Sequence, residues 1–142
     1  MREILFRGQT RRRGEKVNMR GDKLPERWVY GGVLQGTGDY SIIYGGKNLG
    51  DIEKHTVYTD TIGQYTGLTD KNGVKIFEGD IVSYNGRNEV VYFDTSVRIP
   101  CFTTGIGSGS STALHPYKLS ARHKVIGNIH DNPEFIGGGK DE

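Results

Sequence analysis

The chain has 142 residues, including 22 glycines and eight tyrosines, and a formal net charge of +2 at pH 7. This length predicts one domain with enough buried surface to fold without covalent staples. The single cysteine excludes an intrachain disulfide. No apolar run approaches the roughly 18 residues of a membrane span or the stretch of a signal peptide, so we expect a cytoplasmic protein.

The first half of the chain predicts short strands separated by glycine pairs. Frequent glycine and tyrosine disfavour helices and favour strands and turns. The predicted strands are residues 4–7, 16–19, 28–30 and 40–44. The third of them is bounded by Gly31-Gly32, the fourth ends at Gly45-Gly46, and the first two are joined across residues 10–14.

Two Asn-Gly pairs organise the middle of the chain. Residues 64–68 and 74–77 flank Asn72-Gly73, and residues 80–84 and 88–93 flank Asn85-Gly86. Asn-Gly tolerates the positive φ that tight hairpin turns require, so both segments predict antiparallel hairpins. Apolar residues on both faces of 90–93 favour a sheet covered on both sides. The predicted fold class is mainly β, with antiparallel hairpins or a meander curled into a small SH3-like barrel or an open barrel, an N-terminal β extension and little helix.

The last third of the chain predicts a loop, a strand and one helical turn. Residues 103–112 are mostly Gly, Ser and Thr, which is typical of a long loop. Residues 124–129 predict the final strand, and Asn132-Pro133-Glu134 predicts a single helical turn. We expect a single domain over 1–142, with an N-terminal β region over 1–60, hairpins and the C-terminal strand over 61–136, and a disordered tail over 137–142.

A long central motif resembles the YopX family. It runs from Thr61-Ile62-Gly63-Gln64-Tyr65-Thr66-Gly67-Leu68 through Asp70-Lys71-Asn72-Gly73 to Glu78-Gly79-Asp80-Ile81-Val82. Residues 1–7, 28–31, 125–129 and 132–134 match flanking parts in the right order. The resemblance implies a phage or prophage protein of unknown function and supplies no catalytic, cofactor or binding residues. Gly8-Gln9 and the segment 94–123 depart from the family pattern.

No set of residues predicts a metal centre or a reactive nucleophile. The histidines at 55, 115, 123 and 130 have no short ligand spacing, and Cys101 has no second cysteine beside it. Cys101 lies in an apolar segment, where an inert buried thiol is the better interpretation. We expect no metal and no cofactor.

The carboxylates and the glycine-rich run are better explained by turns than by catalysis. Glu78 with Asp80, and Asp131 with Glu134, could act as acid and base, but a Gly-Asp turn accounts for Asp80. Residues 105–109 lack the Gly-Lys-Ser/Thr ending of a phosphate loop. We therefore expect a protein that is not an enzyme.

A basic N-terminal region carries the most specific binding hypothesis. Residues 1–30 hold nine Lys/Arg and four Asp/Glu, a net of +5. The candidate polyanion-binding residues are Arg7, Arg11, Arg12, Arg13, Lys16 and Arg20, with Trp28 or Tyr30 as stacking surfaces. The favoured function is a non-catalytic interaction or assembly protein that binds a phage or host protein or forms a homo-oligomer, because open sheet edges invite pairing. Nucleic-acid binding is the alternative.

Overall fold

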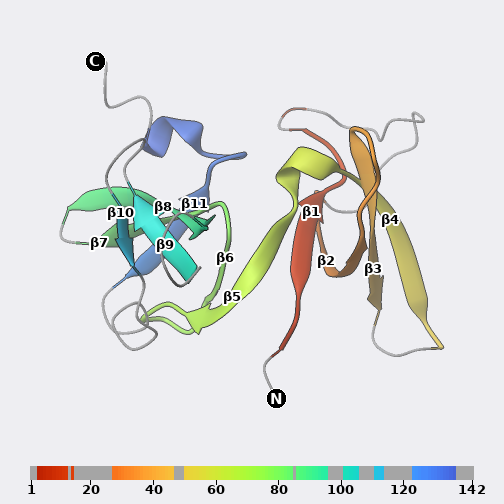
Figure 1. Ribbon diagram of the computed structural model, residues 1–142, viewed down its shortest axis with the longest axis horizontal. Coiled ribbons are helices and arrows are strands. Elements are labelled where there is room, and N and C mark those ends of the chain that lie inside the picture. Colours follow the sequence, from red (N-terminus) through yellow and green to blue (C-terminus); the bar gives the residue numbers. More distant parts are fainter. Residues whose placement is uncertain are drawn as a thin grey trace. The chain divides into compact units, whose positions relative to one another are not determined.

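Antiparallel strands make up most of the described part of the chain (Figure 1). The computed structural model describes residues 3–12, 14, 27–46, 50–84, 86–95, 101–105, 111–113 and 123–136. Its elements are β1 (Phe6–Gln9), β2 (Trp28–Leu34), β3 (Tyr40–Gly46), β4 (Ile52–Tyr58), η1 (Thr59–Thr61), β5 (Gly63–Thr69), β6 (Lys75–Phe77), β7 (Asp80–Tyr84), β8 (Arg87–Asp94), β9 (Cys101–Gly105), β10 (Ser111–Ala113), β11 (Lys124–Asn128) and η2 (Pro133–Phe135). The prediction of a mainly β antiparallel fold with little helix is confirmed.

The chain forms two compact units, Met1–Gln64 and Tyr65–Glu142. β5 contributes to both, since Gly63 and Gln64 pair with β1, whereas Tyr65 and Thr69 pair with β6. The expectation of a single domain over 1–142, divided at residues 60 and 61, stays a prediction.

The first sheet has the order β4-β3-β2-β1-β5-β6, and unit 1 contains its strands from β4 to β1 with the beginning of β5. One face of this sheet is apolar and buried, with Val29, Ile43 and Val57 at its centre. Phe6, Val33 and Ile62 pack against them. The alternation of β3, in which Ser41 and Ile43 are buried and both flanking tyrosines are exposed, directs one side of the strand into this core.

The N-terminal strand has different neighbours from those expected. β1 pairs with β2 on one side and with β5 on the other, and the predicted strand over 16–19 lies outside the described residues. β2 also continues through Gly31-Gly32, so the predicted boundary at these glycines is wrong. A Cβ built on Gly31 would overlap the backbone carbonyl of Tyr44 in β3, so the close approach of these two strands explains glycine here.

β4 has no counterpart among the predicted strands. Only Val57 of its seven residues is buried, so the strand lacks the alternation that marks a half-buried strand in a sequence. Its backbone instead pairs with the whole of β3, from Tyr40 opposite Tyr58 to Gly46 opposite Ile52.

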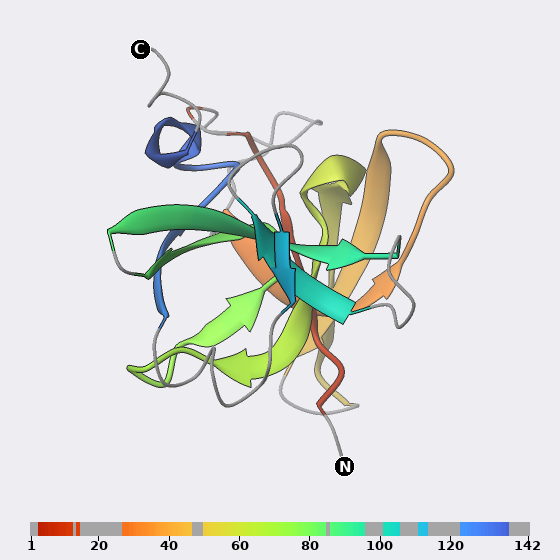
Figure 2. The ribbon, with the colours of Figure 1, turned by 60° about the vertical axis from the view of Figure 1, so that its left-hand side comes forward.

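Both hairpins predicted in unit 2 are confirmed. β5 and β6 pair around Gly73, whose φ is 83°, and β7 and β8 pair around Gly86, whose φ is 78°. Figure 2 shows the green β7–β8 hairpin with the blue strand β11 beside β7. A core of Ile76, Val82 and Val91 lies between the two hairpins, and Leu68 and Val125 pack against it.

The second sheet has the order β10-β9-β8-β7-β11. The predicted loop over 103–112 is wrong at both ends, because Thr103 to Gly105 and Ser111 to Thr112 lie in strands that pair with each other. Thr104 also pairs with Val91, so cross-strand pairing stabilises a segment whose composition suggested a loop. Among the described strands neither sheet closes on itself, so the closed SH3-like form of the prediction is not the one observed.

Candidate functional site

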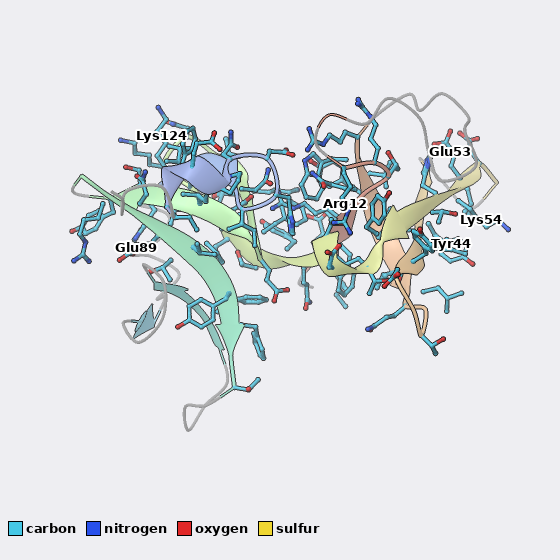
Figure 3. The ribbon with its side chains drawn as sticks, turned by 90° about the horizontal axis from the view of Figure 1, so that it is seen from above. Arg12, Tyr44, Glu53, Lys54, Glu89 and Lys124 are labelled. Carbon is cyan, nitrogen blue, oxygen red and sulfur yellow. The ribbon has the colours of Figure 1, made fainter. Side chains whose placement is uncertain are left out.

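The exposed face of β2, β3 and β4 gathers tyrosine and aliphatic side chains. Register places Leu34 opposite Ile42, and Ile42 opposite Thr56. Opposite residues in antiparallel strands share a face, and so do residues two apart in one strand. This outer face consists of Leu34, Tyr40, Ile42, Tyr44, Ile52, Lys54, Thr56 and Tyr58. Figure 3 shows Tyr44 and Lys54 next to each other, with Glu53 on the other side of β4.

Large apolar side chains of the outer face remain in solvent. The exposed fractions are 56% for Leu34, 47% for Tyr40, 37% for Tyr44 and 51% for Ile52. The rings of Tyr40 and Tyr58 lie 5.5 Å apart, within the range of favourable aromatic pairs. A grouped apolar surface of this kind is typical of sites where another molecule binds, and tyrosine is enriched at such sites.

The buried side of the same sheet makes the outer face rigid. Ile43 and Val57 are fully buried directly beneath it, and Ser41 bonds the Thr59 hydroxyl at 2.8 Å. Side chains presented from a packed strand lose little conformational freedom on binding, which favours affinity. The outer face is therefore a preformed surface.

The predicted polyanion-binding residues are only partly described, and those described do not form an exposed cationic cluster. Arg7 is 6% exposed, and its guanidinium lies 4.5 Å from the centre of the Trp28 ring. Arg11 is half-buried. Arg13, Lys16 and Arg20 lie outside the described residues.

Arg12 is engaged within unit 1. Its Nη1 donates to both carboxylate oxygens of Asp60, at 2.8 and 3.1 Å. Its guanidinium also lies 3.9 Å from the centre of the Tyr58 ring. These contacts tie the segment after β1 to the η1 turn and offset the charge of Arg12 with that of Asp60.

A shallow hollow of about 340 Å³ lies in unit 1 at the ends of β2, β3 and β4. Trp28, Val29, Tyr30, Gly45, Gly46, Glu53 and His55 line it. Glu53 Oε1 lies 3.4 Å from His55 Nε2, with the Glu53 side chain well exposed to solvent. In the described lining of the hollow, Glu53 supplies the one carboxylate and His55 the one imidazole.

The histidines and the cysteine are dispersed through the described structure. The His123 ring stacks on Tyr84 with 5.0 Å between centres, and His130 lies in the turn after β11. Cys101 begins β9, and His115 lies outside the described residues. Within the described ranges, no three His, Cys, Asp or Glu side chains are grouped so that they could hold a metal ion.

The carboxylates of the central motif stabilise turns. Asp80 accepts a hydrogen bond from the Phe77 backbone N–H at 2.7 Å, which confirms a turn role for this residue. Asp70 accepts from the N–H groups of Asn72 and Val74 through Oδ1, and from that of Val125 through Oδ2, all at 2.8 to 2.9 Å. Asp70 thus closes its own hairpin turn and joins it to β11.

Unit 2 also contains a buried carboxylate that the sequence did not single out. Glu89 in β8 is 6% exposed and accepts a hydrogen bond from the Thr104 hydroxyl at 2.8 Å and from Arg87 at 3.1 Å. Both oxygens therefore have donors, as a buried carboxylate requires. The Thr104 bond links β8 to β9, the Arg87 bond lies within β8, and together they explain the burial of the group.

The hydrogen bonds of Asp70 predict a pH-dependent stability. Burial alone would raise the pKa of its carboxyl, but the three backbone donors, with the positive charge of Lys124, lower it below the ordinary 3.8. The unfolded chain therefore takes up the proton first as the pH falls. The contribution of Asp70 is fully present above that ordinary value and is lost as the pH falls through the lower folded pKa. We expect the stability difference between wild type and Asp70→Asn, measured by urea unfolding, to be constant above about pH 5 and to shrink below pH 3.8.

No helix among the described residues has the length and apolarity to cross a membrane. Both helical elements are single 3-10 turns of three residues.

Comparison with known families decides the classification of the chain. The family model described as YopX protein matches residues 22–137. The chain belongs to the YopX family. The resemblance found in the sequence is thereby confirmed, and the match includes residues of both units of this YopX-family chain.

The fold of the YopX-family chain is similar to that of protein EF1440 from Enterococcus faecalis, known from a crystal structure. The two are 23% identical in sequence with a TM-score of 0.50, and the similarity covers 96% of this chain and 99% of the other. Among curated proteins no match was found. The likeness to EF1440 therefore concerns the fold.

Sequence reasoning did not identify the outer face as a site. The segment 40–44 was predicted as a strand, and its alternation already placed Tyr40 and Tyr44 on one side. What was missing was β4, whose exposed residues complete the face and whose pairing with β3 establishes the register.

Proposed function

We propose that this YopX-family chain is a non-catalytic interaction protein that binds another protein chain through the outer face of unit 1. The observation that supports the proposal is the group of exposed Leu34, Tyr40, Tyr44 and Ile52 on one rigid sheet surface. Interfaces between proteins are built around aromatic and aliphatic anchors of this type, with charged groups kept to the rim. The proposed setting is a phage or prophage inside its bacterial host cell.

A protein partner fits this surface better than a nucleic acid does. Among the eight described residues of the outer face, Lys54 is the only one with a charged side chain, and the Arg12 guanidinium lies against Tyr58 at the edge of the face. Binding to phosphates requires several exposed cations, whereas Arg7 is buried and Arg12 is paired with Asp60. The nucleic-acid alternative rests on the basic residues outside the described ranges, and nuclease treatment distinguishes the two partners.

The test compares three versions of the chain expressed in induced or infected host cells. They are wild type, Tyr40→Ser/Tyr44→Ser on the outer face, and Val74→Ser as a matched control, because Val74 is 48% exposed at a hairpin turn of unit 2. Chains that co-purify with wild type after nuclease treatment are identified, purified and titrated against each version. We expect the double variant to bind at least about tenfold more weakly, and the control to bind within about twofold of wild type.

Two results would contradict the proposal. One is the recovery of no protein, or its loss upon nuclease treatment, which would favour the nucleic-acid alternative. The other is unchanged affinity of the Tyr40→Ser/Tyr44→Ser variant. Both variants must first show the tryptophan emission of wild type, which reports folding of unit 1 because Trp28 is the single tryptophan of the chain.

A further inference from the structure

β4 leaves one long side of its backbone without a neighbouring strand among the described residues. It is the first strand in the order β4-β3-β2-β1-β5-β6, and Figure 1 shows it at the outer side of its sheet. Ile52, Glu53, Lys54 and Thr56 are all exposed. An edge of this kind presents N–H and C=O groups that can pair with a further strand.

β4 is the most extensive of the strands that end a sheet. It has seven residues, compared with three in β6, three in β10 and five in β11. More residues give more backbone hydrogen bonds on pairing and a better specified register. β4 is also the edge at which the outer face ends, so a strand added here would extend that face.

Symmetry restricts how a second copy can pair with this edge. Two identical antiparallel strands are related by a two-fold axis, and residues opposite each other must point to the same side of the sheet. The two-fold axis must therefore pass through a residue of β4, which then lies opposite the same residue of the second copy. Only in such a register does the outer face of one copy continue into the outer face of the other.

Among these registers, the one centred on His55 fits best. His55 is the middle residue of β4, so this register pairs all seven residues. It places Lys54 opposite Thr56 of the second copy, and Ile52 opposite Tyr58. An axis through Lys54 or Glu53 would instead bring two like charges directly opposite each other, which is destabilising.

We infer that two copies of the chain pair through β4 in the antiparallel register centred on His55, and that the two outer faces then form one continuous surface. This inference rests on the proposed function, since it names a second copy as one partner of the same surface. Each copy contributes the exposed Ile52 and places it opposite Tyr58 of the other copy, a half-buried residue whose ring lies against the Arg12 guanidinium. The side chain of Lys54 remains at the solvent side of the junction, where it can stay hydrated.

Disulfide trapping tests this register. Cysteines are introduced singly at Lys54, His55 and Thr56, in a background in which Cys101 is replaced by serine. Residues directly opposite have Cα atoms about 4.5–5.5 Å apart, within the reach of a disulfide, whereas diagonal neighbours are about 7–8 Å apart and beyond it. We expect His55→Cys alone to form a covalent dimer upon oxidation, and Lys54→Cys and Thr56→Cys to do so efficiently only when mixed.

Sedimentation of the wild-type chain gives the independent measurement. We expect the weight-average mass to rise with concentration from one chain towards two. A constant monomer mass up to about millimolar concentration would overturn the inference, and so would efficient trapping of Lys54→Cys with itself, because it requires another register. If a different protein still binds the outer face of such a monomer, the proposed function stands and only the self-pairing fails. The mixed pair keeps the test valid if His55→Cys does not fold, since Lys54 and Thr56 are both exposed.

Discussion

Replacement of Gly31 by alanine should abolish the native arrangement of β2 and β3 or lower the free energy of unfolding by more than about 3 kcal/mol. The new Cβ would overlap the carbonyl oxygen of Tyr44, which is a backbone atom of the paired strand and cannot rotate away. Relief therefore requires the two strands to separate, and this removes support from the core of Ile43 and Val57.

The neighbouring glycine supplies a matched control. A Cβ built on Gly32 meets no atom within 4 Å, although the residue lies in the same strand. Gly32→Ala should therefore change stability by no more than about 0.5 kcal/mol. Urea unfolding followed by Trp28 fluorescence measures both variants, since Trp28 begins β2. Equal stability of the two variants would mean that β2 and β3 do not approach each other as closely as described.

Replacement of Asp70 by alanine should lower the stability of unit 2 by about 3 kcal/mol or more, because three backbone N–H groups lose their acceptor at once. Asp70 is 3% exposed, so water has little access to these donors. The β5–β6 turn and the beginning of β11 should loosen together. Amide hydrogen exchange at Asn72, Val74 and Val125 measures this effect directly.

Asp70→Asn separates the two roles of the residue. Its Oδ1 can still accept from Asn72 and Val74, but its Nδ2 replaces the oxygen that accepts from Val125 and places two donors face to face. We expect a smaller loss, of about 1–2 kcal/mol, with faster exchange mainly at Val125. Equal exchange at all three amides in both variants would show that Asp70 does not join the turn to β11.

The central motif was the part of the fold most accessible from the sequence. Asn72-Gly73 and Asn85-Gly86 lie between apolar segments, and the structure has a hairpin at each. The positive φ of Gly73 and Gly86 is a local requirement that the residue type reveals without knowledge of the rest of the chain. The turn role of Asp80 and the helical turn at Pro133 were also predictable, because both depend on residues nearby in the sequence.

The sequence patterns failed to predict strands that are stabilised mainly by pairing with a neighbouring strand. β4 is mostly exposed and β9 contains glycine and threonine, so neither shows hydrophobic alternation. Their pairing with β3 and β8 provides the hydrogen bonds that the local sequence does not suggest. Gly31 was interpreted as a strand boundary for the same reason, since only the position of Tyr44 shows why glycine is required within the strand.

The amino-acid sequence by itself determined the β character of the chain, its two hairpins and its family, because turn chemistry and a long motif are local properties of the polypeptide. The tertiary structure alone decided the outer face and the burial of Arg7. Both depend on which strands become neighbours, and that choice depends on the cooperative packing of residues far apart in the chain. The burial of Arg7 and the exposure of Tyr40 therefore follow from the pairing of the strands and not from the local sequence around either residue.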